Sequence, residues 1–188
     1  MVKNYFWDSC VFIAYLNDDS HAYDINSLET YISEVESGKS KIFTSTVSLA
    51  EVTPSKLSKS DTETFQEFLS DFQGSVISID PSPYININAG LLKDIKYKKN
   101  NSNKRVLTTG DALMLATALE LEETHGVILE AFHTYDNGRG KGHPEGKGVP
   151  LLDFDQWLDD VEKDDLIERV LNINICKPIH PQPNLFDA

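Results

Sequence analysis

The sequence predicts an α/β fold in which helices cover both faces of a mostly parallel sheet. Its 188 residues, of which 40% are hydrophobic, are enough for one compact domain with a substantial core. Short apolar segments typical of strands alternate along the chain with longer segments of helical periodicity. Because strands separated by helices need crossover connections, such strands pair in parallel and are covered on both faces.

The N-terminal part of the chain predicts one strand and two helices. Residues 5–7 are apolar and are typical of a strand. A turn at Asp8 follows, and residues 11–16 predict a short helix. Residues 23–36 predict a second helix, which ends before Gly38 because glycine adopts the left-handed cap conformation at little steric cost.

The next part predicts two strands with two helices between them. Residues 41–44 are a short strand, and residues 46–52 are a helix that Pro54 bends or ends. Residues 61–72 place apolar side chains three and four positions apart, as an amphipathic helix does. Val76–Ile79 is the third strand.

The third part predicts helix, helix and strand. A helix begins after Pro81 or Pro83 and runs to about Lys98. Residues 111–125 form a helix that is apolar on most sides, which indicates burial between the sheet and its neighbours. Residues 127–135 are the fourth strand candidate.

The last part predicts a loop, a helix and a tail. Residues 137–148 are rich in glycine and form a loop, and residues 154–171 predict a surface helix. The tail from Lys177 onward contains prolines and is expected to lack regular structure. We therefore expect a main domain at residues 1–150, with an acidic helix and a proline-containing tail at residues 151–188 packed on the same domain.

Four acidic residues are predicted to meet at one edge of this sheet. In parallel sheets, ligands bind beyond the carboxyl ends of the strands, where loops and helix N-termini converge. Asp8 ends the first strand and Asp136 ends a later one, which places both at that edge. Glu51 lies about a turn and a half into a helix that begins there, and Asp111 lies in the first turn of another.

A divalent cation would relieve the repulsion among these carboxylates. Crowded carboxylates raise one another's pKa, so the cluster needs a counter-charge. Sites built from oxygen ligands suit Mg²⁺ or Mn²⁺. One or two such ions would activate a water molecule and stabilise charge at a phosphodiester, so hydrolysis of a nucleic-acid backbone is the reaction that this chemistry serves best.

Each acid also has an ordinary structural explanation. Asp8 fits a helix cap or a turn. Asp111 fits the first turn of a helix, where the helix dipole favours a negative charge. Asp136 fits the opening of the glycine-rich loop. Glu51 differs because its neighbours in the sequence are apolar, so a charge at that position needs a reason.

Four segments that contain these acids resemble the PIN-domain family, and most closely the VapC-like toxins of bacterial toxin–antitoxin pairs. In chain order they are residues 8–11 (DSCV), 48–52 (SLAEV), 110–118 (GDALMLATA) and 134–136 (TYD). The resemblance covers about residues 3 to 140. It implies a three-layer α/β/α, Rossmann-like fold, dependence on Mg²⁺ or Mn²⁺, and cleavage of single-stranded or structured RNA.

The resemblance also implies roles for individual residues. The metal ligands that it implies are Asp8, Asp111 and Asp136. Glu51 would be a further ligand or a base that orients water. Ser9 and Thr134 match small hydroxyl positions that support the first and last acids, although ordinary strand-end caps explain them equally well.

The same resemblance implies RNA as substrate and an antitoxin protein that blocks the acidic site as partner. The chain is longer than a compact toxin of the family, through the glycine and lysine loop and the residues after Asp153. This departure leaves open the toxin identity, the partner and the substrate, and the sequence also leaves open a homodimer.

The distribution of charge bears on whether RNA can bind. The net charge of −13 repels a polyanion on average. However, residues 153–168 hold eight acids and one base, while residues 93–105 hold six bases and one acid. The candidate RNA-binding residues after Asp136 are Arg139, Lys141 and Lys147. Those in the earlier basic segment are Lys104 and Arg105. A solvated helix end is the alternative explanation for the earlier segment.

Other features limit the range of functions. Asp8 interrupts the N-terminal apolar stretch, so we expect no signal peptide, no membrane span and a cytoplasmic protein. Cys10 and Cys176 have no companions at metal-ligand spacing and are expected to be buried apolar residues. The sequence also lacks a glycine-rich phosphate loop with lysine and serine or threonine, which excludes a nucleoside triphosphatase of that type.

Two rival functions remain open at this point. One is a catalytically silent PIN-fold module that binds RNA or protein. The other is a phosphoryl-transfer enzyme on a similar sheet, such as a response regulator or a haloacid-dehalogenase-like protein. The second ranks lower because Asp8 is followed by serine and cysteine, without the paired acids that such proteins carry there.

Overall fold

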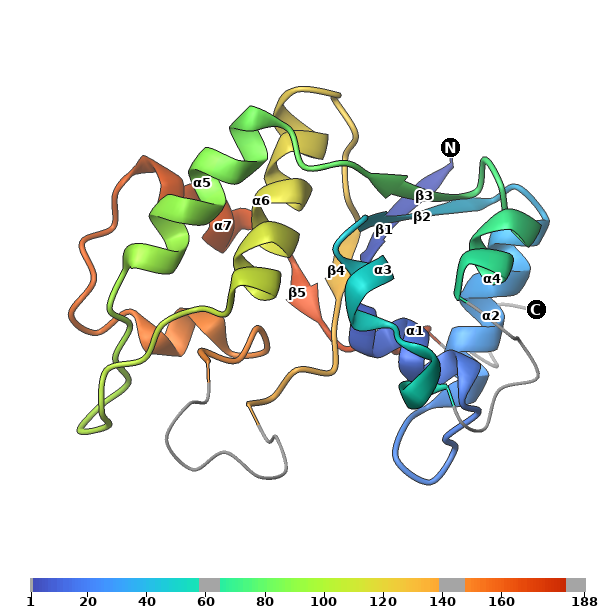
Figure 1. Ribbon diagram of the computed structural model, residues 1–188, viewed down its shortest axis with the longest axis horizontal. Coiled ribbons are helices and arrows are strands. Elements are labelled where there is room, and N and C mark those ends of the chain that lie inside the picture. Colours follow the sequence, from blue (N-terminus) through green and yellow to red (C-terminus); the bar gives the residue numbers. More distant parts are fainter. Residues whose placement is uncertain (1, 58–64, 139–147, 182–188) are drawn as a thin grey trace, which may run out of the picture.

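The computed structural model describes residues 2–57, 65–138 and 148–181 and contains a parallel sheet with helices on both faces (Figure 1). The sheet has five strands in the order β3-β2-β1-β4-β5, and all of its strand pairs are parallel. The strands are β1 Lys3–Trp7, β2 Ser40–Ser45, β3 Val76–Ile79, β4 Ala131–His133 and β5 Ile175–Cys176. The predicted fold class is therefore confirmed.

The helices form two layers, one against each face of the sheet. One face is covered by α5 Pro83–Asp94, α6 Thr109–Glu123 and α7 Asp165–Asn172 (Figure 1). The other is covered by α1 Ser9–Leu16, α2 Ile25–Glu36 and α4 Phe65–Asp71. A short helix, α3 Ser48–Glu51, follows β2 at the edge where the strands end.

The alternation of side chains along β1 explains why there are two cores. Phe6 packs with α5, α6 and α7, while Tyr5 and Trp7 pack with α1, α2 and α4. Phe6 and Trp7 are both fully buried, as expected for a central strand of a sheet that helices cover on both faces. The position of Asp8, the next residue, follows directly from this strand.

Two predicted helices are shorter in the structure. The helix expected at residues 46–52 is only Ser48–Glu51, followed by a 3-10 turn at Pro54–Lys56. The helix expected to reach Lys98 ends at Asp94. Tyr97 is fully buried and pairs through its backbone with Arg105, so the chain leaves the helix early to bury this aromatic ring.

The prediction of one surface helix at residues 154–171 is wrong. The structure has a 3-10 turn at Phe154–Trp157 and a separate helix, α7, from Asp165. Phe154 and Trp157 are buried. The backbone N–H of Lys98 donates to the carbonyl of Trp157, and the carbonyl of Lys98 accepts from the N–H of Asp159. Burial of these aromatic rings against residues 97–105 interrupts the helical pattern that the acidic sequence suggests.

The C-terminal part completes the sheet. The strand predicted at residues 127–135 is limited to β4, and β5, which the sequence analysis missed, pairs with it. The backbone N–H of Thr134 donates to the carbonyl of Cys176 at 3.0 Å. Among the described residues, no helix is both long and apolar enough to cross a membrane.

Candidate active site

Asp8 lies where β1 ends and α1 begins. Its backbone N–H donates to the carbonyl of His133 at 3.0 Å, which continues the pairing of β1 with β4. Its carboxylate accepts from the N–H of Ser9 at 2.7 Å and so caps α1. The structural explanation as a helix cap therefore applies to Asp8, and any chemical role is added to it.

The carboxyl group of Asp8 is buried and held by side chains from two elements. Thr134 Oγ1 donates to its Oδ2 at 2.7 Å, and the thiol of Cys10 donates to the same oxygen at 3.0 Å. Burial raises the pKa of Asp8; the hydrogen bonds from Cys10 and Thr134 oppose this rise, and the charge of Glu51 adds to it. The charged form of Asp8 is therefore disfavoured unless a positive group lies beside it.

Glu51 reaches the same region from the end of α3. Ser9 Oγ donates to Glu51 Oε2 and lies 3.5 Å from Ser48 Oγ. A side chain at position 110 would overlap Glu51 Oε1, so the glycine there leaves room for this carboxylate. The carboxylate of Glu51 therefore lies against the hydroxyl of Ser9 in α1 and against Gly110 at the beginning of α6.

Asp111 lies in the first turn of α6, which Thr108 caps. The N–H of Asp111 donates to Thr108 Oγ1 at 3.1 Å, and this hydroxyl donates to Asp111 Oδ2 at 2.5 Å. Burial raises the pKa of Asp111 to about 7, against the hydrogen bond from Thr108. The charges of three other carboxylates add to the rise, namely Asp136, Asp8 and Glu51.

Asp136 follows β4 and anchors the chain that returns to the sheet. Its Oδ1 accepts from the N–H of Gly138 at 2.9 Å, and its Oδ2 accepts from the N–H of Leu151 at 3.0 Å. Its own N–H donates to Thr134 Oγ1 at 3.0 Å. Each carboxylate oxygen has two lone pairs, so these bonds leave acceptor capacity for a further ligand.

The structure thus brings all four predicted acids to the carboxyl edge of the sheet, together with Ser9 and Thr134. Thr134 connects the first and last of them, because it donates to Asp8 and accepts from the backbone of Asp136. Within the described ranges, no three acidic, histidine or cysteine side chains stand in an arrangement that could hold a metal ion as placed. Several of the carboxylate oxygens are instead turned into the hydrogen bonds given above.

Cys10 is a part of this site that the sequence analysis missed. It was expected to be an apolar residue, whereas its sulfur donates to Asp8, accepts from the N–H of Tyr135 at 3.1 Å and lies 3.4 Å from Thr134 Oγ1. Burial raises the pKa of this thiol well above its usual value, so it stays a neutral donor. Its position two residues after a strand-end acid was the signal available in the sequence.

The predicted RNA-binding residues divide into two groups. Arg139, Lys141 and Lys147 lie outside the described residues. Lys104 forms an ion pair with Asp160 at 3.7 Å, and the guanidinium of Arg105 lies 4.5 Å from the centre of the Trp157 ring. Both of these described cations are thus engaged in contacts within the protein.

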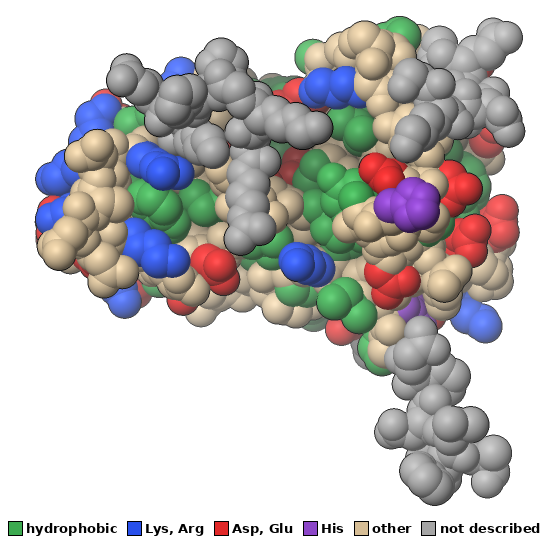
Figure 2. All heavy atoms as spheres, turned by 90° about the horizontal axis from the view of Figure 1, so that it is seen from below, with side chains coloured by type: hydrophobic (Ala, Val, Ile, Leu, Met, Phe, Trp, Pro, Cys, Tyr) green, Lys and Arg blue, Asp and Glu red, His purple; other side chains and the backbone are tan. Residues whose placement is uncertain are grey.

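Figure 2 shows the molecule from the side at which the strands end. Most of the visible lysine and arginine side chains lie toward the end that carries residues 95–105, and most of the visible acids lie toward the opposite end. The charge is therefore segregated across this face, despite the overall excess of acids. The segregation is not the one that the sequence suggests, because Asp160 of the acidic segment pairs with Lys98 and Lys104 of the basic segment.

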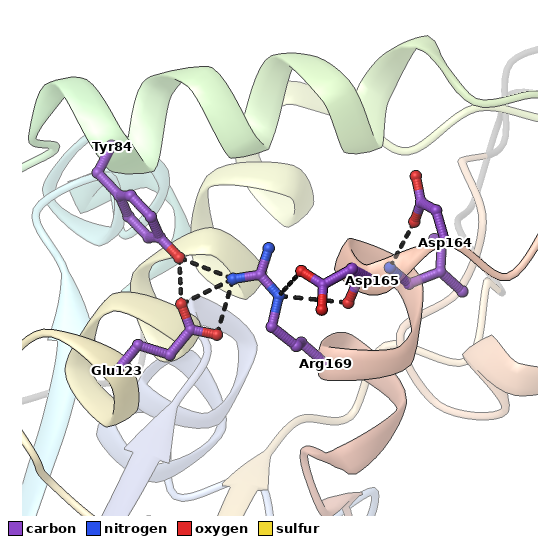
Figure 3. Close-up of polar contacts among 6 residues, drawn as sticks. Tyr84, Glu123, Asp164, Asp165 and Arg169 are labelled. Carbon is purple, nitrogen blue, oxygen red and sulfur yellow. Dashed lines mark hydrogen bonds and ion pairs between the residues drawn. The ribbon is translucent and has the colours of Figure 1, made fainter.

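A second polar cluster is separate from the acidic site. Arg169 of α7 forms an ion pair with Glu123 at 2.7 Å and with Asp165 at 3.0 Å, and it donates to the hydroxyl of Tyr84 at 3.0 Å (Figure 3). Glu123 ends α6, whereas Asp111 lies in its first turn, about 18 Å away at 1.5 Å per residue. This cluster joins three helices, and its distance from the acids makes it a useful control region.

The fold and the site together define the chain as a three-layer α/β protein with four carboxylates at the carboxyl edge of a parallel sheet. No protein-family model matches the sequence, and no curated protein matches it either. Among solved structures, the chain is similar to one described as VapBC2 from Rickettsia felis bound to a DNA fragment from its promoter. The identity is 19%, the alignment covers 68% of this chain and 97% of the other, and the TM-score is 0.38. A likeness of this size assigns no activity.

Proposed function

We propose that the chain is a metal-dependent endoribonuclease of the PIN type, which hydrolyses RNA phosphodiester bonds. One observation carries the proposal: four carboxylates from distant segments lie close enough to act on one another's charge. The pKa of Asp111 is raised to about 7, first by burial and then by the charges of Asp136, Asp8 and Glu51, and these charge contributions express the coupling. A protein gains nothing in stability from such crowding, so the arrangement supports a chemical role.

The donor set fits a hard divalent cation. Asp8 and Asp111 are carboxylic acids whose pKa values are raised by burial and by neighbouring acids, and a cation would favour their charged forms. Oxygen ligands of this kind suit Mg²⁺ or Mn²⁺. The residues that would hold it are Asp8, Asp111 and Asp136, with Glu51 as a further ligand or as a base that orients water. When bound, such an ion supplies an activated water and stabilises charge at a phosphoryl group.

The other residues of the site would keep these acids in place. Thr134 and Cys10 both donate to Asp8 Oδ2 and thereby fix its orientation. Thr108 holds Asp111 through the cap of α6, and Ser9 holds Glu51. Each acid thus has a partner from its own or a neighbouring element, which is the support that a preorganised site needs.

A toxin of a toxin–antitoxin pair is the form of this activity that the sequence resemblance favours. Its partner would then be an antitoxin protein that covers the acidic edge. The test is co-purification of the chain with the product of an adjacent reading frame, followed by loss of RNA cleavage in the complex. Cleavage that persists in the complex would contradict this part of the proposal.

A catalytically silent module is the second candidate, and one observation favours it. Both oxygens of Asp136 accept backbone N–H groups, which is what a purely structural anchor of the returning chain would do. Thermal unfolding with Mn²⁺ separates the two candidates. A nuclease should be stabilised by the ion in a manner that depends on Asp8 and Asp111, whereas a silent module should not.

The direct test is cleavage of single-stranded RNA by the purified chain with Mn²⁺ or Mg²⁺. We expect Asp8→Asn and Asp111→Asn each to reduce the cleavage rate by two orders of magnitude or more, as loss of an essential ligand does. Asp71→Asn, an exposed acid on α4, is the matched control and should cleave like the wild type. Equal cleavage by the wild type and by the Asp8→Asn, Asp111→Asn double variant would overturn the proposal.

A further inference from the structure

A cavity of about 450 Å³ lies beside the acidic site, between three segments that are far apart in the sequence. It is formed by residues 22–24 before α2, by residues 135 and 137 after β4, and by residues 177 and 179 after β5. The lining side chains used below are Tyr23, Asp24, Tyr135, Asn137 and Lys177. Cavities of a few hundred cubic ångströms are the size that holds small ligands.

The cavity adjoins the acids through the chain itself. Tyr135 and Asn137 are the residues before and after Asp136, and both line the cavity. The N–H of Tyr135 donates to the sulfur of Cys10, whose thiol donates to Asp8. The cavity and the carboxylate of Asp136 therefore share the short segment of chain at residues 135–137.

Two tyrosine rings form the aromatic part of the cavity. The ring centres of Tyr23 and Tyr135 are 4.4 Å apart, with an angle of 47° between the ring planes. Both side chains are partly exposed, so ring surface remains available at the cavity. Flat aromatic surface at a nucleic-acid site binds bases by stacking, largely without regard to their sequence.

The hydroxyl of Tyr135 is the second, independent observation. It is out of contact with solvent, yet it has no hydrogen-bond partner among the described residues. A buried polar group without a partner destabilises a fold by an amount similar to a lost hydrogen bond, so such groups are rare. The phenol lies within electrostatic reach of Asp24 and Tyr23, which line the same cavity. A ligand with a polar edge would satisfy it once the ring of Tyr135 turns toward the cavity.

The charged groups at the cavity have different availability. The carboxylate of Asp24 caps α2, because it accepts from Ser27 N at 3.2 Å and Ser27 Oγ at 2.7 Å. Its remaining lone pairs can accept from amino groups of a base. Lys177 is exposed and lines the cavity, so its cation is available for a phosphate.

We propose that this cavity is a nucleobase subsite, which holds one unstacked base of single-stranded RNA beside the phosphodiester that is cut at the acids. The proposal rests on the function proposed above and adds to it the substrate class. The base stacks on the tyrosine pair, the ring of Tyr135 turns so that its hydroxyl bonds to the polar edge of the base, and Lys177 binds the adjoining phosphate. A duplex is excluded from the subsite because its bases are stacked and paired within the helix.

The test measures binding separately from cleavage. The Kd of a fluorescent single-stranded RNA oligonucleotide is measured by anisotropy on an Asp8→Asn background, which binds without cutting. We expect Tyr23→Ala to raise the Kd roughly 5- to 100-fold, the range for loss of one stacking partner. We expect Lys177→Ala to reduce the slope of log Kd against log salt by about 0.7, as loss of one phosphate contact on a single strand does. Lys41→Ala, an exposed lysine on β2, is the control and should change neither quantity.

Tyr135→Phe gives a result that a merely structural tyrosine would not give. Removal of a buried hydroxyl without a partner should leave the fold equally stable or more stable in thermal unfolding, while it weakens RNA binding several-fold. Normal binding by this variant, together with normal binding by Tyr23→Ala, would overturn the subsite.

An abasic oligonucleotide separates failure of the subsite from failure of the proposed function. If the subsite is correct, removal of the base next to the cut position weakens binding to the parent protein but not to Tyr23→Ala. If the wild type cuts RNA yet both proteins bind abasic and intact strands alike, the subsite is wrong and the nuclease stands. If no RNA is cut but Tyr23 still governs affinity for the intact strand, the nuclease is wrong and the base-binding cavity stands.

Discussion

The replacement of Asp111 by asparagine should stabilise the protein in the absence of metal, and more so at high pH. The folded-state pKa of Asp111 is about 7, above its ordinary value of 3.8. The folded protein therefore holds this proton more tightly than the unfolded chain does. As the pH rises from about 4 to about 7, the unfolded chain loses the proton first, and the wild type loses stability throughout that window.

The size of the effect follows from the shift. The two states differ by nearly one proton at this group at pH 5 and by about half a proton at pH 7, where the folded state is half protonated. At about 1.4 kcal/mol per proton and pH unit, the total over this range is about 2.3 kcal/mol. Because Asp111 is only partly buried by solvent accessibility, water weakens the effect, and we expect about 2 kcal/mol. Asparagine does not titrate, so the variant should lack this part of the pH dependence.

The assay is urea unfolding of the wild type and Asp111→Asn at pH 5 and pH 8, with a chelator present. The difference in unfolding free energy between the two proteins should grow by about 2 kcal/mol from the lower to the higher pH, in favour of the variant. Asp71→Asn, as control, should show no such growth. A difference in unfolding free energy between the two proteins that is the same at both pH values would refute the raised pKa of Asp111.

Three further predictions concern other parts of the fold. Gly110→Ala should change the unfolding free energy by less than about 1 kcal/mol, because the overlapping atom, Glu51 Oε1, ends a flexible side chain and can move. It should reduce cleavage, because Glu51 is displaced; a wild-type cleavage rate would show that the position of this carboxylate does not matter. Thr134→Val should raise the Mn²⁺ concentration needed for cleavage, because Asp8 loses its 2.7 Å donor; an unchanged metal dependence would argue against this support. Arg169→Ala should lower the unfolding free energy by about 1 kcal/mol, because it removes two ion pairs. It should leave the specific cleavage rate of the folded protein unchanged, because these ion pairs join helices far from the acids. A changed rate would link the two regions.

Much of the fold could be predicted from the sequence, because its strands and helices are separated by clear turn residues. Three of the four predicted strands overlap closely with β1, β2 and β3. The errors lie where distant contacts override local preference. Trp157 is buried against residues 97–105, which no local pattern indicates, and the two-residue strand β5 exists only because the edge of β4 is available to pair with it.

The four acids could be placed from the sequence because the residues that follow parallel strands meet at one edge of the sheet. What the sequence could not give is the use of each polar atom. Cys10 looked apolar, but its sulfur bonds to a carboxylate across the turn. The cavity between Tyr23, Tyr135 and Lys177 joins segments that lie between 42 and 154 residues apart, so it has no local signature.

The pairing of β5 with β4 has a consequence for shortened forms of the protein. Thr134, which supports two of the acids, has its backbone N–H bonded to Cys176. A chain that stopped before Ile175 would leave the outer edge of β4 open, with unpaired backbone groups two residues from Asp136. Open strand edges pair with strands of other molecules. A version of the protein shortened in this way should therefore self-associate through β4, next to the acidic site.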